Sequence, residues 1–87
     1  MALKLTIDQE IAIETLGVDI KGTIRDGLVL IVTDREGNVM ERQEISGTHA
    51  DIDLTDLPIG SYRLAAREES IAGNKIFSNW VEFTVIK

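Results

Sequence analysis

The acidic stretch around the single histidine is where this sequence could do chemistry. In "HADIDLTD", residues 49–56, His49 is followed by carboxylates at Asp51 and Asp53. Alternate residues of a strand share a face, so these side chains could lie together and contribute oxygen ligands to Ca²⁺. The EF-hand spacing is incomplete, and the segment supplies no partner for a catalytic histidine. We predict a solvated strand face with no catalytic residue, metal or cofactor. The alternative is a small enzyme or metal-dependent binder built on Asp51, Asp53 and His49.

Composition narrows the class of protein further. The chain has 87 residues, 44% of them hydrophobic, and no cysteine, which excludes disulfides and thiolate chemistry. Nine basic residues are scattered among fifteen acidic ones, giving a net charge of −6, so neither nucleic acid nor an anionic membrane is an expected partner. The first ten residues have no apolar run of signal-peptide length, and no stretch approaches the roughly 20 apolar residues of a membrane span. We predict one domain over residues 1–87.

Apolar residues recur at every second position near the start of the chain, which is typical of β-strands. We expect strands at about 2–8 and 15–23, with a bulge or turn near 15–17 where the apolar phase changes. A helix over 8–16 is the alternative, since an aspartate could begin it, although the isoleucines favour strand. The expected inward residues are Leu3, Leu5, Ile7, Ile11 and Ile13 in the odd phase, then Leu16, Val18 and Ile20 in the even phase.

The rest of the chain continues the strand pattern. The apolar run at 28–32 predicts a central strand covered on both faces, "DREGN" at 34–38 a hairpin turn, and the polar stretch at 39–45 an edge strand. About seven strands, spaced by 8–12 residues, predict an all-β antiparallel Greek-key immunoglobulin-like sandwich. Further inward residues are Ala50, Ile52, Leu54, Tyr62, Leu64, Ala66, Val81, Phe83 and Val85, with Arg63, Ala65 and Arg67 outward.

The segment "DLPIGSY", residues 56–62, is the most specific structural signal. A tyrosine just after a turn between two sheets can pack its ring in the core while its hydroxyl bonds to the backbone a few residues upstream, forming a tyrosine corner. Pro58 presets φ for the turn, and Gly60 admits a positive φ. We expect Leu57 to plug the core beneath the crossing and Tyr62 to make the hydrogen bond.

These corner residues resemble the signature that precedes the penultimate strand of fibronectin type III and bacterial immunoglobulin-like domains. The stretch "SNWVEFTV", residues 78–85, is similar to the closing strand of that family. The sequence departs from the family in lacking a tryptophan in the second strand and in a shorter Gly-to-Tyr spacing. The resemblance implies a β-sandwich with recognition at its loops or edges.

Trp80 is the main candidate for contact with a partner. The inward phase of the closing strand points Trp80 outward, where an exposed tryptophan can anchor an interface; a bulge that turns it into the core is the alternative. Ile71, Asn74 and Phe77 flank the same loop and could extend an apolar patch. An open edge strand that accepts a partner strand is another route to contact.

We therefore predict a non-catalytic structural or interaction module. The favoured setting is a bacteriophage virion, as a head decoration or tail accessory protein with capsid proteins, tail proteins or its own copies as partners. The alternative is a module excised from a secreted or cell-surface adhesin or a carbohydrate-active enzyme, which would place it outside the cell.

Overall fold

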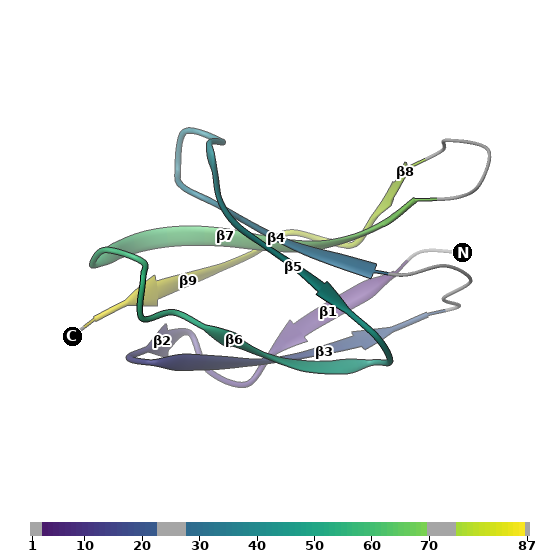
Figure 1. The fold of residues 1–87 in the computed structure, drawn as a ribbon, viewed down its shortest axis with the longest axis horizontal. Coiled ribbons are helices and arrows are strands. Elements are labelled where there is room, and N and C mark those ends of the chain that lie inside the picture. The colour runs from purple at the N-terminus through teal and green to yellow at the C-terminus, as the bar shows by residue number, and fades with distance from the viewer. Residues whose placement is uncertain (1–2, 23–27, 70–74, 87) are drawn as a thin grey trace.

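Two β-sheets pack face to face in the computed structural model, which describes residues 3–22, 28–69 and 75–86 (Figure 1). Every strand pairing in these ranges is antiparallel except the parallel pairing of β2 with β9. The smaller sheet has the order β1-β3-β6, with β1 at Lys4–Ile7, β3 at Thr15–Lys21 and β6 at His49–Asp53. The larger sheet has the order β2-β9-β7-β4-β5, with β8 paired to β7. Its strands are β2 (Ile11–Ala12), β4 (Leu28–Thr33), β5 (Val39–Ile45), β7 (Gly60–Glu69), β8 (Lys75–Phe77) and β9 (Val81–Val85).

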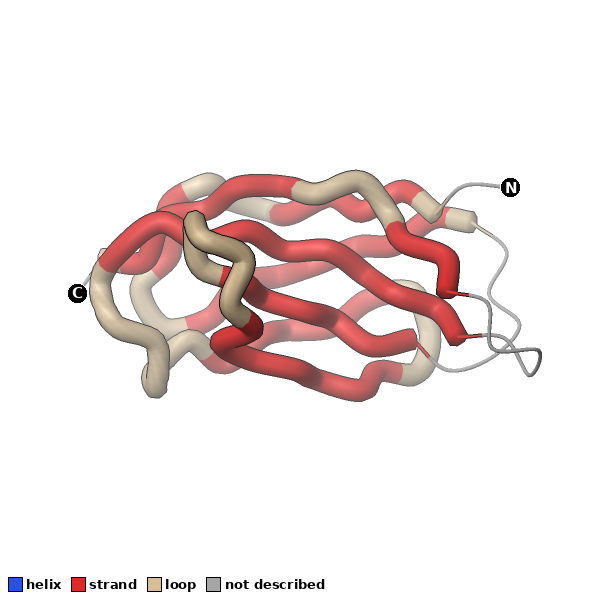
Figure 2. The backbone as a smooth tube through the Cα atoms, turned by 90° about the horizontal axis from the view of Figure 1, so that it is seen from above, coloured by secondary structure: helices blue, strands red, loops and turns tan. Residues whose placement is uncertain are grey.

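The prediction of an all-β sandwich is confirmed. The strands run lengthwise along a molecule that measures 40 × 23 × 18 Å (Figure 2). The described residues form nine strands where about seven were predicted, because β2 and β8 are too short to show an alternating pattern. None of the described segments forms a helix able to span a membrane. The assignment of residues 1–87 to one domain stays a prediction.

A single hydrophobic core fills the space between the two sheets. As predicted, β4 lies inside the larger sheet between β7 and β5, and β5 is an edge strand. Burying these branched and aromatic side chains is the main favourable term for a chain without disulfides. The largest fully buried side chains are Leu5, Leu16, Val18, Ile20, Leu28, Leu30, Val32, Ile52, Leu54, Leu64, Phe83 and Val85.

Two isoleucines predicted to face inward are exposed. Ile11 and Ile13 are 58% and 57% exposed, whereas Ala12 between them is buried. The prediction was wrong because the chain leaves the smaller sheet after β1 and joins the edge of the larger sheet as β2, which reverses the inward phase. Asp8 secures this change of layer, since its N–H donates to the Gly17 carbonyl at 3.1 Å and its Oδ1 accepts from the Gly17 N–H at 3.2 Å.

Ala65 departs from prediction in the opposite sense. It was expected to face solvent but is fully buried, opposite Ile31 on the neighbouring central strand. The Ala65 methyl group lies in the middle of the sheet, where the larger side chains around it cover it. Ala65 is therefore buried even though it points away from the core.

The tyrosine corner is present. Tyr62 Oη donates a hydrogen bond to the Pro58 carbonyl at 2.6 Å, and its ring stacks on Phe83 with a centroid separation of 5.8 Å. Leu57 is buried beneath the crossing, and Gly60 has the predicted positive φ, 158°. The corner therefore ties the entry of β7 to the core.

The predicted hairpin between β4 and β5 is also present. Asp34 Oδ1 accepts from the N–H groups of Glu36 and Asn38, both at 2.9 Å, and Gly37 takes a φ of 93°. These bonds favour the ionised carboxylate, so they lower the pKa of Asp34, with the Asn38 side chain as the largest cause.

Candidate functional site

Phe77 and Trp80 form an exposed aromatic pair. Phe77 ends β8, Trp80 directly precedes β9, and the two rings stack with centroids 6.2 Å apart and an interplanar angle of 24°. Their side chains stay 45% and 47% exposed, so Trp80 points outward and not into the core. Ile71 and Asn74, predicted to belong to the same patch, lie outside the described residues.

Ser78 anchors the segment between the two rings. Its N–H donates to the Ala66 carbonyl and its Oγ accepts from the Ala66 N–H, both at 2.8 Å. The same hydroxyl donates to the Asn79 carbonyl at 2.9 Å. Ser78 is buried, so these bonds are shielded from water, and the backbone between Phe77 and Trp80 is fixed to β7.

Asn79 ties this segment to the other sheet. Its Oδ1 accepts from the Leu5 N–H at 2.8 Å, and its Nδ2 donates to the Leu5 carbonyl at 3.0 Å. One side-chain amide thus satisfies both backbone groups of Leu5, which point away from β3, and bridges the two layers. The sequence suggested only a bulge near Asn79; the polar Ser-Asn pair between two strands was the available signal for such backbone bonds.

This arrangement presents two aromatic faces on a pre-ordered backbone. Aromatic side chains have few rotatable bonds, and mutual stacking restricts the rings further, so little conformational entropy is lost when a partner covers them. Exposed tryptophans with these properties are typical anchors of protein interfaces.

His49 lies between two carboxylates on the outer face of the smaller sheet. Its Nδ1 is 2.9 Å from Asp19 Oδ1, and its Nε2 is 3.6 Å from Asp51 Oδ1. The hydrogen bond to Asp19 is the largest cause of a raised pKa for His49, and the negative charges of both aspartates add to it. Asp19 comes from the paired residue of β3, and nothing in the sequence marks this contact in advance.

The cluster suits a protonated imidazole and not a metal ion. The carboxylates of Asp19 and Asp51 lie beside different ring nitrogens of His49, so the three side chains do not converge on one point. The predicted third member, Asp53, instead accepts from the Thr55 N–H at 2.9 Å and its hydroxyl at 2.7 Å, which lowers the pKa of Asp53. Within the described ranges no group of three or more His, Cys, Asp or Glu is arranged to hold a metal.

A groove at the β2 edge, lined by both apolar and polar side chains, is a further feature that the sequence did not reveal. It has a volume of about 430 Å³, and its lining includes Ile11, Ile13 and Ile86. Glutamates precede and follow the isoleucine pair, at Glu10 and Glu14. These glutamates were the available signal that the two isoleucines are exposed, because charged residues on both sides are unusual for a pair of core residues.

No family model matches this sequence, and no curated protein matches it significantly. Among solved structures, the chain is similar to CopC from Methylosinus trichosporium OB3b, with 18% sequence identity and a TM-score of 0.61. The likeness covers 88% of this chain and 82% of that chain. At this identity it shows the fold alone, a small β-sandwich that the two proteins share.

This match corrects the functional prediction. A solved structure that shares the fold is CopC, and not a virion protein, an adhesin or a carbohydrate-active enzyme. The interpretation as a bacteriophage decoration or tail protein is contradicted, together with its adhesin or enzyme-module alternative. The predicted location in a virion is therefore not supported either.

Proposed function

We propose that this protein is a docking domain that binds a partner protein through the aromatic pair Phe77 and Trp80. The observation that carries the proposal is that two stacked rings stay nearly half exposed while the two residues between them, Ser78 and Asn79, are hydrogen-bonded to both sheets. The proposal includes no catalysis.

The exposed ring surface is large enough to drive binding. Aromatic side chains bury about 150–250 Å² each when fully covered, so the exposed fractions of these two leave roughly 140–230 Å² for a partner. At about 25 cal/mol per Å², covering that surface would contribute roughly 3.5–6 kcal/mol before the entropic costs of association. A flat apolar pair of this size suits an apolar pocket on a protein better than a charged ligand.

A copper function is not proposed. Copper sites in proteins draw on imidazole, thiolate and thioether ligands. This chain has one histidine, no cysteine and two methionines, and its histidine is engaged by aspartates at both nitrogens. The residues present therefore do not fit a copper ion.

Two further assignments belong to this proposal. The first is an immunoglobulin-like Greek-key topology related to fibronectin type III or bacterial immunoglobulin-like domains, which the tyrosine corner supports. The second is an extracellular setting, the part of the predicted location that does not depend on a virion.

The test compares baits that differ at one side chain. Wild-type protein, Trp80→Ala and Phe77→Ala are used to capture partners from the native source, with Ile59→Ala as the control for a more exposed apolar side chain elsewhere. We expect Trp80→Ala to lose a specific partner that Ile59→Ala retains, with purified components showing about a tenfold or greater loss of affinity.

Trp80 is the only tryptophan, so its fluorescence reports binding directly in wild-type protein. The melting temperature of Trp80→Ala should stay close to that of wild type. Equal capture by wild type and Trp80→Ala would refute the proposal. A collapse of stability in that variant would also refute it, by assigning the ring to the fold.

A further inference from the structure

Strand β2 leaves one side of its backbone unpaired at the edge of the larger sheet. Its carbonyls at Glu10 and Ala12 accept from the N–H groups of Thr84 and Ile86, at 2.8 and 3.0 Å. Alternate residues of a parallel strand direct their backbone groups to opposite sides, so the N–H and C=O of Ile11 point away from β9. No strand among the described residues pairs with β2 on that side.

Exposed apolar side chains border this open edge. Ile11, Ile13 and Ile86, the last 42% exposed, line the 430 Å³ groove together with Gln9, Glu14 and Thr15. Isoleucines are poorly suited to solvent, and adjacent β-branched side chains on a strand edge favour the docking of another strand. The edge therefore offers both hydrogen-bonding groups and an apolar surface.

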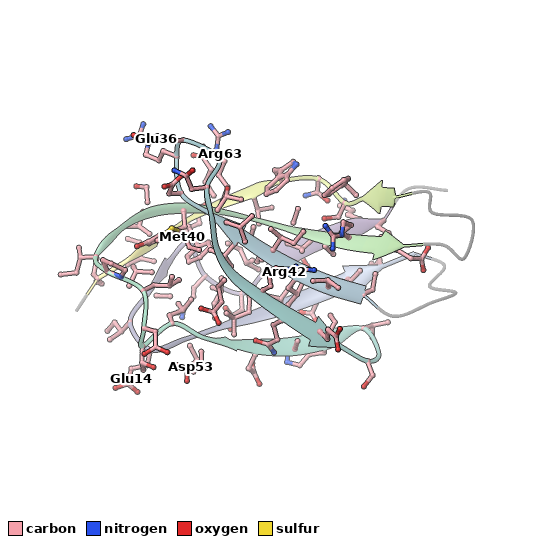
Figure 3. All side chains as sticks on the ribbon, turned by 45° about the horizontal axis from the view of Figure 1, so that its top comes forward. Glu14, Glu36, Met40, Arg42, Asp53 and Arg63 are labelled. Atoms are coloured by element: carbon pink, nitrogen blue, oxygen red, sulfur yellow. The ribbon has the colours of Figure 1, made fainter. Side chains whose placement is uncertain are left out.

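The charge around the groove is negative. Glu10 and Glu14 flank the two isoleucines, and across the described ranges neither carboxylate takes part in an ion pair. Glu14 also lies beside Asp53 at the same end of the molecule, where the residue after Glu14 pairs with Asp53 (Figure 3). An occupant of this groove must tolerate or neutralise that charge.

We propose that the β2 edge binds an extended segment of a partner protein in which apolar and basic residues alternate. The segment adds as a strand beside Ile11, its backbone pairing with the free N–H and C=O of that residue. Its apolar side chains cover the isoleucines, and its lysines or arginines face Glu10 and Glu14. A second copy of this chain fits poorly, because pairing two β2 edges would bring the same glutamates together.

This surface is separate from the aromatic pair. Strand β2 lies at the end of the sandwich that carries the C-terminus, and β8, which carries Phe77, lies toward the opposite end (Figure 1). The proposal does not depend on the function assigned to the aromatic pair, and Trp80→Ala should leave binding at β2 unchanged.

The test uses the full chain, labelled with ¹⁵N, and the probe peptide acetyl-Lys-Val-Lys-Val-Lys-Val-Lys-amide. We expect saturable amide shifts at residues 10–13 and 84–86, and slower hydrogen exchange at the Ile11 N–H. Ile11→Lys should weaken binding by about tenfold, through lost apolar contact and added repulsion. Ile59→Lys is the matched control and should bind like wild type. The peptide with glutamate at every lysine should not bind measurably at about 1 mM.

Ile11→Pro removes the outward N–H together with the isoleucine side chain, and edge strands tolerate proline where the N–H faces solvent. It should abolish binding of the lysine peptide. A lysine peptide with N-methylated valines tests the same backbone bonds without any change to the protein.

Four results would overturn the proposal: no binding of the lysine peptide, equal binding of the glutamate peptide, binding unaffected by Ile11→Lys, or full binding of the N-methylated peptide. A wild-type dimer that Ile11→Pro dissociates would also overturn it, by assigning the edge to a second copy.

Discussion

Replacing Tyr62 with phenylalanine removes one oxygen and tests the corner directly. The ring keeps its burial and its stacking on Phe83, so the change isolates the 2.6 Å hydrogen bond to the Pro58 carbonyl. A net intramolecular hydrogen bond contributes about 0.5–1.5 kcal/mol. Pro58 is exposed, so water can reach its carbonyl in the variant, and we expect a loss near the middle of that range, about 1 kcal/mol.

The corresponding change in melting temperature follows from chain length. At about 2.1 cal/mol/K per residue, 87 residues give an unfolding entropy of roughly 180 cal/mol/K. A loss of about 1 kcal/mol then lowers the melting temperature by roughly 5–6 °C. Tyr62→Ala should cost about 3–5 kcal/mol, because it also removes a buried ring.

The assay is urea and thermal unfolding followed by circular dichroism, with Ser61→Ala as a control on the neighbouring exposed residue. We expect Tyr62→Phe to shift the urea midpoint without changing the slope, and Ser61→Ala to stay within about 0.5 kcal/mol of wild type. A Tyr62→Phe variant as stable as wild type would show that the hydroxyl does not secure the crossing.

Two further predictions concern the bridge between the sheets and the histidine. Asn79→Ala leaves both backbone groups of Leu5 without their partner and should lower the free energy of unfolding in urea by about 2 kcal/mol. Asn79→Asp should not restore the stability, because an oxygen would then face the Leu5 carbonyl. A loss under about 0.5 kcal/mol in Asn79→Ala would contradict the bridge. The pKa of His49, followed by NMR titration, should lie above 6.5 and fall in Asp19→Asn. Because the folded-state pKa is raised, this interaction stabilises the fold below pH 6.5 and is lost as the pH rises through the folded-state pKa; an unchanged value in Asp19→Asn would contradict the pairing.

The local pattern of the chain was sufficient for the core and the corner. Alternation placed Leu16, Val18 and Ile20 inward because a strand buried on one face permits only one phase. The tyrosine just after the Pro-x-Gly turn predicted a hydrogen bond to the backbone a few residues upstream, and the acceptor is the Pro58 carbonyl, four residues away. Both features depend on neighbours in sequence, so they are readable without knowledge of the rest of the fold.

The candidate sites were only partly predictable, because they also depend on contacts that neighbouring residues in the sequence do not determine. The outward phase of Trp80 is local, but its stacking on Phe77 requires the backbone path that Ser78 fixes against Ala66. The contact between His49 and Asp19 joins residues 30 positions apart, through the pairing of β3 with β6. Sequence periodicity carries no information on which strands become neighbours.

The sequence by itself determined the longer strands, most of their inward faces and the tyrosine corner, because these follow from short-range geometry and the burial of apolar side chains. Only the tertiary structure decided that the chain changes layer after β1. That crossing turns Ile11 and Ile13 from expected core residues into an exposed edge, because the phase of a strand has meaning only relative to the sheet it joins.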